Sequence, residues 1–351
     1  VKAVQFKDGT EVPADLVVMA VGIRPNTELA EKMNLHVNRG IVVTDTLQTV
    51  TDARIYSVGE CAAHRGIAYG LVAPLFEQAK VPMPGAKATW DEWVEASRKV
   101  AKATETKAAM AWDRSGHRFA GPAISYGAKV FDAQGNAVID DGYKAAVSKF
   151  VGWHKDGTML KEVWAGSGGS TYADSIGEFI NGNVVMVLSG SWQINRLQKD
   201  IGNKFDWQAI PNPCGTASCT GIPGGAAWVA LKTSKSPKET AAFLNFMAAE
   251  ANYAEFIAKT NNIPAHAGLA KKGVNYTNAQ PAAKAALTVF GTGVAKLSPV
   301  AYKFQGYKYN RAIMLPTVSR VTQAVVGELS VDEAVNKINA DMQDAVKQAQ
   351  K

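Results

Sequence analysis

The sequence predicts an α/β protein whose longer part, residues 82–351, is rich in helices. Its 351 residues, 47% of them hydrophobic, suffice for two domains or for one large two-lobed domain with a proper core. The longest apolar runs, Leu16–Ile23 and Val184–Leu188, have the length of buried strands and fall far short of the roughly 20 residues that cross a bilayer. We therefore expect mixed α/β structure and no membrane span.

The charge balance changes near residue 81. Residues 1–80 carry 8 Lys and Arg against 9 Asp and Glu, a net charge of −1, whereas the remainder carries 30 against 22, a net charge of +8. The lysines of the basic part are spread over helices rather than clustered in a stripe with aromatic residues, which argues against nucleic-acid binding. The contrast suits two segments of different origin.

The first eighty residues alternate between strand-like runs and turns. Val1–Phe6 alternates like a strand, and Leu16–Val21 is apolar throughout, like a strand buried on both faces. A short helix is expected at Asn26–Met33, and further strands at Ile41–Val43 and Ile55–Val58. These elements predict a small α/β fragment.

Gly59 and Glu60 follow the last of these strands, where an open α/β sheet places ligands. The Glu60 carboxylate could accept hydrogen bonds from ligand hydroxyls, although a solvated Glu at an ordinary strand end has the same spacing. The sequence favours the first interpretation because four stretches resemble the FAD-binding part of the large subunit of NAD(P)H-dependent nitrite reductase: AVGIRPNTELA (20–30), RGIVV (39–43), IYSVGECAAHRG (55–66) and YGLVAPLFEQAK (69–80).

This resemblance covers residues 1–81 and implies a partial FAD- and NAD(P)-binding fragment of the pyridine nucleotide-disulfide oxidoreductase family. In that family the residue matching Glu60 holds the ribityl chain of FAD. No G-x-G-x-x-G occurs in the chain, so neither dinucleotide has its pyrophosphate cradle at a helix N-terminus. We expect Gly59 and Glu60 to be a vestigial site, and no bound cofactor unless the fragment were complete.

The three cysteines leave two alternatives open. Cys214 and Cys219 lie in one short loop that a disulfide could close in an oxidising compartment, and two free thiols fit the spacing equally well. Cys61 stands alone. Because no second cysteine pair or close histidine pair accompanies them, we expect no zinc site.

Residues 82–351 contain three clear signals for the start of a helix. Thr89, Ser236 and Ser330 each precede a glutamate by three residues, which is the pattern of a capping box, and Pro237 adds a favourable first helical residue. Strands are expected at Val184–Leu188 and Ala227–Leu231.

The loops after these runs carry residues suited to a sugar. Ser191 and Trp192 follow the strand Val184–Leu188, and Gly224 and Gly225 precede the strand at 227–231. A sugar ring has one face of C–H bonds and a rim of hydroxyls, so it fits a flat indole beside backbone N–H donors. Trp112 and Asp113 offer a second aromatic with a charged neighbour. An indole in the core is the ordinary alternative for each tryptophan, and it is the one expected for Trp93, Trp207 and Trp228.

Six stretches of this segment look like the extracellular solute-binding proteins of carbohydrate ABC transporters: ATWDEW (88–93), FINGNVVM with GSW (179–186 and 190–192), GGAAWVA (224–230), AAFLNF (241–246), NIPA (262–265) and GELSVDEA (327–334). The resemblance implies a type II periplasmic-binding-protein lobe over residues 82–351, with an incomplete first lobe. It implies ligand contacts at Trp112, Ser191, Trp192, Gly224 and Gly225, and in the late segment at Tyr307 and Arg311.

Three functions follow as hypotheses. The leading one is capture of a sugar or sugar-phosphate for ABC permease subunits, without chemistry and weakened by the incomplete lobe. The second is an oxidoreductase fragment of nitrite reductase type, and the third a chimaera with neither activity. The resemblance implies a periplasmic or extracellular location, whereas a chain without a leader would stay cytoplasmic. The chain has no recognisable nucleophile elbow, so we do not expect an enzyme.

Overall fold

The computed structural model describes residues 3–5, 9–13, 26–38, 40–44, 46, 48–57, 62–64, 67–68, 75–166, 172–202 and 204–351. The chain divides into two compact units, Val1–Val72 and Ala73–Lys351. Each unit has its own sheet structure.

The first unit contains short strands and one helix. Strands β1 (Ala3–Gln5) and β2 (Glu11–Pro13) pair antiparallel, and β3 (Ile41–Val43) pairs parallel with β4 (Ala62–His64), which pairs antiparallel with β5 (Ile67–Ala68). Helix α1 (Glu28–Lys32) lies within the predicted helix. The predicted strand at 55–58 is wrong over its described residues, because Tyr56 forms only an isolated bridge with Gln48. The run 16–21 lies outside the described residues.

The second unit is built on two parallel strands, β6 (Ala108–Trp112) and β7 (Val184–Leu188). Both are buried at their amino ends, and β6 is buried along its whole length. The helices of this unit are α2 (Leu75–Gln78), α3 (Trp90–Ala103), α4 (Gly116–Ser125), α5 (Asp141–Lys155), α6 (Ser175–Ile180), α7 (Ile194–Ile201), α8 (Pro237–Ala248), α9 (Glu250–Thr260), α10 (Ala267–Lys272), α11 (Pro281–Val294), α12 (Pro299–Phe304), α13 (Asn310–Val326) and α14 (Val331–Ala349), with 3-10 turns η2 (Lys161–Val163) and η3 (Ser191–Gln193).

Two of the three predicted capping boxes are confirmed. The side chains of Thr89 and Ser330 each accept a hydrogen bond from the backbone N–H of the glutamate three residues later. The carboxylate of that glutamate in turn accepts a hydrogen bond from the backbone N–H of the capping residue. Ser236 makes no side-chain cap hydrogen bond. Its backbone N–H donates instead to the Ser234 hydroxyl at 3.2 Å, so the local turn replaces the box.

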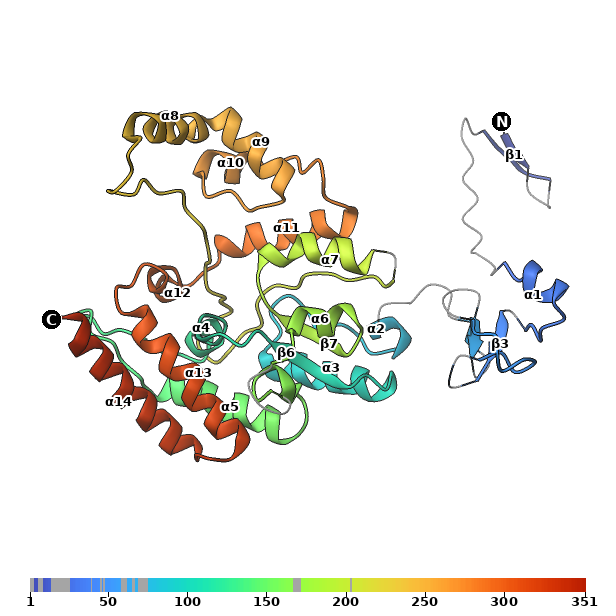
Figure 1. Ribbon diagram of the computed structural model, residues 1–351, viewed down its shortest axis with the longest axis horizontal. Coiled ribbons are helices and arrows are strands. Elements are labelled where there is room, and N and C mark those ends of the chain that lie inside the picture. The colour runs from blue at the N-terminus through green and yellow to red at the C-terminus, as the bar shows by residue number, and fades with distance from the viewer. Residues whose placement is uncertain are drawn as a thin grey trace. The chain divides into compact units, whose positions relative to one another are not determined.

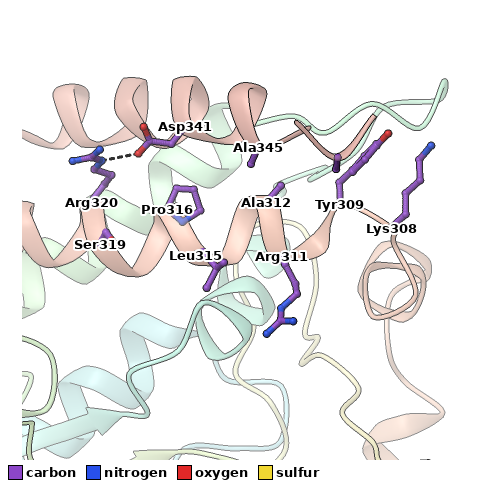
Figure 2. Close-up of a pocket in the computed structure, with 11 residues that line it drawn as sticks. Lys308, Tyr309, Arg311, Ala312, Leu315, Pro316, Ser319, Arg320, Asp341 and Ala345 are labelled. Carbon is purple, nitrogen blue, oxygen red and sulfur yellow. Dashed lines mark hydrogen bonds and ion pairs between the residues drawn. The ribbon is translucent and has the colours of Figure 1, made fainter. Parts of the chain in front are cut away.

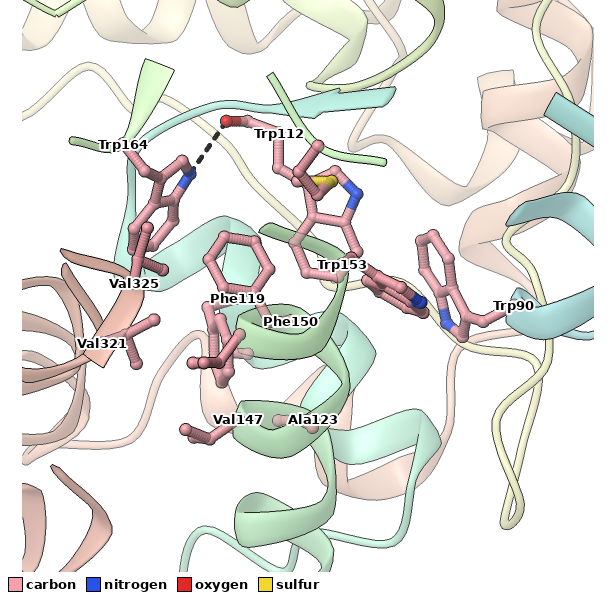
Figure 3. Packing of buried hydrophobic residues seen from close by; sticks show 14 of the residues in the cluster. Trp90, Trp112, Phe119, Ala123, Val147, Phe150, Trp153, Trp164, Val321 and Val325 are labelled. Atoms are coloured by element: carbon pink, nitrogen blue, oxygen red, sulfur yellow. Dashed lines mark hydrogen bonds between the residues drawn. The ribbon is translucent and has the colours of Figure 1, made fainter. Parts of the chain in front are cut away.

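An aromatic cluster forms the centre of the second unit (Figure 3). The ring of Phe150 on α5 lies 5.0 Å from that of Trp112, 5.5 Å from Phe119 and 4.6 Å from Trp164, measured between centroids. The Trp164 indole N–H donates to the backbone oxygen of Trp112 at 3.0 Å. Helices α13 and α14 pack side by side and add Val321 and Ile338 to the same core. This core fixes the carboxyl ends of β6 and β7.

Helices α8, α9 and α10 form a group separated from β6 and β7 by α7 and α11 (Figure 1). The chain that enters α8, residues 224–233, is exposed throughout and forms no strand. The predicted strand Ala227–Leu231 is therefore wrong, because an extended segment needs a hydrogen-bonded neighbour to become a strand. Trp228, expected in the core, is 45% exposed, whereas Trp93 is buried as expected.

Two further expectations concern covalent and membrane structure. Cys214 and Cys219 form a disulfide, which decides between the two alternatives that the sequence left open. Cys214 also forms an isolated bridge with Thr89, at the cap of α3. Across the described ranges, no helix is both long enough and apolar enough to cross a membrane.

Candidate ligand-binding site

The candidate site lies at the carboxyl ends of β6 and β7, where two parallel strands end side by side. Trp112 pairs with Leu188 as the last residues of the ladder, and Asp113 donates its backbone N–H to the Leu188 oxygen at 3.1 Å. The residues that follow, Asp113 on one strand and Ser189 on the other, therefore meet at one edge. Ligands in α/β proteins bind at such edges.

Asp113 organises this edge. One of its carboxylate oxygens accepts the Ser175 hydroxyl at the start of α6, and the other accepts the Ser189 hydroxyl. Arg118 on α4 places its Nε 3.8 Å from the second oxygen. The carboxylate is partly exposed, at 22%, so it keeps some access to a ligand. Asp113 thus joins both strands and two helices.

Arg118 supports the indole of Trp192. The guanidinium is 9% exposed, donates to the Ser189 backbone oxygen at 2.8 Å, and lies 4.7 Å from the centre of the Trp192 ring. Burial lowers the pKa of Arg118, and the Asp113 carboxylate opposes that shift. A cation against the aromatic face attracts the ring, and this contact fixes its position. Trp192 itself stays 52% exposed.

His117 contacts two segments that are far from it in the sequence. Its Nε2 contacts the Pro223 backbone oxygen at 3.1 Å and the Gln305 side-chain oxygen at 2.9 Å. Because both partners are oxygens, the neutral ring carries its proton on Nε2, and Nδ1 accepts from Arg118 at 3.4 Å. Burial lowers the pKa of His117, and the charge of Arg118 lowers it further. The ring is therefore neutral at pH 7.

Glycines let the Trp192 ring lie close to the backbone. A Cβ on Gly190 would overlap the indole, and a Cβ on Gly224 would lie 3.6 Å from Cζ3 of Trp192. Neither the backbone N–H groups of Gly224 and Gly225 nor the Ser191 hydroxyl forms a hydrogen bond with a described residue. A half-exposed ring thus stands beside donors that a ligand could use.

Arg114 and Tyr172 flank the same strand end. The Arg114 guanidinium carbon lies 3.9 Å from the centre of the Tyr172 ring, and its Nε donates to the Trp164 backbone oxygen at 3.2 Å. Tyr172 is 40% exposed. Together they form a second aromatic surface with a cation behind it.

The structure does not place Trp112 on this surface. Its side chain is 2% exposed and packs against Trp90, Phe150 and Trp153, with centroid distances of 5.1, 5.0 and 5.8 Å. Successive residues of a strand point to opposite faces, so Trp112 enters the core while Asp113 faces the site. The expectation of a sugar platform at Trp112 is corrected accordingly.

Tyr307 and Arg311 also lie elsewhere. The Tyr307 hydroxyl donates to the Gly135 backbone oxygen at 2.9 Å, and its ring packs 5.0 Å from that of Phe131. Arg311 lines a groove of about 630 Å³ between α13 and α14 (Figure 2). From the late segment it is instead Gln305 that reaches the site, through His117.

Gly59 and Glu60, the vestigial FAD residues, lie outside the described residues. At the strand edge, sequence reasoning missed Arg118, His117, Ser175 and Ser189. A signal for one of them was present, since Ser189 directly follows the apolar run that was predicted as a strand.

The second unit is thus a helix-rich α/β unit whose two parallel strands end at one polar edge. The family model for bacterial extracellular solute-binding proteins matches residues 2–254, and the chain belongs to this family.

Solved structures share the fold at low identity. The GacH receptor of Streptomyces glaucescens is 19% identical, with a TM-score of 0.59 over 78% of this chain and 66% of that one. The sugar-binding protein MalE of Xanthomonas citri is 17% identical, with a TM-score of 0.58 over 82% and 72%. An ABC substrate-binding protein of Listeria monocytogenes, solved with cycloalternan, is 18% identical, with a TM-score of 0.60 over 78% and 67%. These likenesses confirm the predicted periplasmic-binding-protein-like fold.

Curated relatives match a shorter stretch of the chain. A nitrite reductase [NAD(P)H] of Bacillus subtilis is 67% identical over 81 residues, which is 23% of this chain and 10% of that protein. The nitrite reductase (NADH) large subunit of Escherichia coli is 43% identical over 82 residues, again 10% of its length. The chain therefore spans about a tenth of these relatives, and both sequence resemblances, joined in one chimaeric chain, are confirmed.

Proposed function

We propose that the chain binds a carbohydrate at the edge formed by Asp113, Arg118 and Trp192, as the substrate-binding component of an ABC transporter, without chemistry. One observation carries the proposal: the Trp192 ring is held by Arg118 and by the close backbone of Gly190, yet half of it is exposed. A fixed, accessible indole beside polar groups suits the C–H face of a sugar ring.

The surrounding groups suit the rim of such a ring. The Asp113 carboxylate has lone pairs beyond those used by two serine hydroxyls, so it can accept a sugar hydroxyl. The Ser191 hydroxyl and the backbone of Gly224 and Gly225 supply donors. Because Arg118 is buried beside Asp113, its charge is offset, which favours a neutral sugar beside Trp192; a sugar-phosphate would instead use the Arg114 guanidinium that packs on Tyr172 at the same strand end.

Isothermal titration of the full chain with a panel of monosaccharides, disaccharides and sugar-phosphates tests the proposal. We expect heat with at least one neutral sugar, at weak affinity because an open edge buries less of a ligand than an enclosed cleft. Silence across the whole panel would refute carbohydrate binding.

The nitrite-reductase-like segment supports a second candidate, a flavin-dependent activity of residues 1–81. We propose instead that this segment holds no FAD, because the chain has no G-x-G-x-x-G to receive the pyrophosphate. A colourless purified protein without NAD(P)H-dependent reduction of an electron acceptor is expected. A yellow protein would overturn this part of the proposal.

We further propose a periplasmic or extracellular place of action and permease subunits as partners. The family's description as extracellular supports the location, and the disulfide between Cys214 and Cys219 suits an oxidising compartment. Free thiols at both cysteines in protein isolated from its native cells would contradict the location.

A further inference from the structure

The chain between the disulfide and the binding edge lies along helix α4, and we name residues 214–223 the strap. Near its start, the backbone N–H of Ser218 donates to the Ser125 oxygen at the end of α4, at 3.2 Å. At its end, the Pro223 oxygen lies 3.1 Å from Nε2 of His117 in the first turn of α4. The strap therefore runs antiparallel to the helix and stops where the binding edge begins.

The middle of the strap is held on both sides. A Cβ on Gly121 of α4 would lie 3.4 Å from the carbonyl carbon of Gly221 and 3.5 Å from the backbone nitrogen of Ile222, so helix and strap are in backbone contact. The Ile222 side chain packs against the core. The Thr220 hydroxyl accepts the backbone N–H of Ser298, the cap of α12, at 3.0 Å. The strap thus has little room to shift sideways.

The strap also has little slack along its length. Its contacts at Ser218 and Pro223 are five residues apart, and they reach helix residues that are eight apart, Ser125 and His117. At about 1.5 Å per helical residue, the strap covers about 12 Å, and five residues extend to roughly 17 Å at most. Movement at the start of the strap is therefore passed to its end.

The disulfide fixes the start of the strap to helix α3. The backbone N–H of Cys214 donates to the Ala88 oxygen, and its oxygen accepts from the N–H of Trp90, both at 2.9 Å. Neither the N–H nor the oxygen of Cys219 forms a hydrogen bond with a described residue. The bond between the two sulfur atoms is therefore what ties Cys219 to the start of α3.

The other end of the strap leads directly into the donors of the binding edge. Gly224 and Gly225 follow Pro223, and Gly224 lies against the Trp192 ring. The chain beyond them, through residue 233, is exposed and forms no strand. Because this following chain gives the two glycines no support, their position depends on the strap.

We propose that the disulfide between Cys214 and Cys219 is a positioning element of the binding edge, which holds Gly224 and Gly225 beside Trp192 through the strap. The proposal rests on the sugar binding proposed above. Opening the disulfide frees Cys219, so the strap loosens along α4 and a ligand must order the glycine donors itself. Such ordering weakens binding, and we expect a dissociation constant about fivefold higher.

Isothermal titration of the variant with both Cys214→Ala and Cys219→Ala measures this loss, at a temperature where circular dichroism shows every protein folded. Met342→Ala is the matched control, because Met342 is fully buried on α14, outside the strap and α4, and its truncation also lowers stability. The control should keep the affinity of the unmodified chain. A purely structural role of the disulfide would change stability alone.

A second pair of variants moves the strap while the disulfide stays intact. Gly121→Ala places a Cβ at ordinary contact distance from Gly221, so affinity should stay within twofold. Gly121→Val adds two carbons at this buried contact and displaces the strap, so affinity should fall at least fivefold. Adding the two cysteine substitutions to Gly121→Val should weaken binding little further, because both changes act on one segment.

A sugar-free measurement separates this proposal from the proposed function. Acrylamide quenching of Trp192, taken as the difference between each protein and its Trp192→Phe counterpart, should rise when the cysteines are replaced, because Gly224 no longer lies against the ring. If the unmodified chain binds no sugar and quenching still rises, the proposed function fails and the positioning role stands. Unchanged quenching, a loss of affinity below twofold in the folded cysteine variant, or an equal loss in Met342→Ala, overturns the positioning role.

Discussion

Truncating Trp192 is the sharpest test of the binding edge. The side chain is 52% exposed, so roughly 100 Å² of a large aromatic is accessible to a sugar face. At about 25 cal/mol per Å², covering most of that area contributes about 2 kcal/mol, which corresponds to about a 30-fold change in dissociation constant. Trp192→Ala should therefore raise the dissociation constant of the best sugar by about that factor.

Isothermal titration with the sugar identified for the unmodified chain measures this change. The dissociation constant of Trp192→Phe should fall between those of the unmodified chain and Trp192→Ala, because a smaller ring keeps part of the stacking face. Tyr302→Ala is the matched control, since Tyr302 is an aromatic residue on α12 that is 66% exposed. If Trp192→Ala weakens binding less than threefold, or no more than Tyr302→Ala does, the indole is not the stacking face.

Three further predictions concern stability. Burial lowers the pKa of His154 to about 4, so the unfolded chain takes up this proton from about pH 6.5 downward while the native state does not. Urea unfolding should therefore show that the free energy of unfolding is up to about 3 kcal/mol lower at pH 4 than at pH 6.5. The decrease should be smaller in His154→Gln, and an equal decrease in that variant would contradict this reasoning. Replacing Cys214 and Cys219 with Ala should lower the unfolding free energy by about 2 kcal/mol, because the disulfide closes a loop with a sequence separation of 5; unchanged stability would count against it. Phe150→Ala should cost about 4 kcal/mol by urea unfolding, against less than about 0.5 for the exposed Leu315→Ala, and similar costs would mean that Phe150 is not central to the core.

Local motifs could be predicted from the sequence where only neighbouring residues take part. The boxes at Thr89 and Ser330 need just four residues each, and both formed. The equally local box at Ser236 did not form, because its backbone N–H donates to the Ser234 hydroxyl instead. Val184–Leu188 forms a strand, buried at its first two residues, because its apolar run pairs with β6. Residues 227–231 have the same strand-like composition, but no described residue pairs with them as a strand, and composition cannot report that.

The binding edge was predictable only in part, for a related reason. Trp192 and Gly224 meet as their loops suggested. Arg118 was missed because a helical pattern does not say which polar residue faces a distant loop, and its partner Ser189 lies 71 residues away. Trp112 and Asp113 could not be assigned to opposite faces, because β6 is buried throughout and shows no alternation.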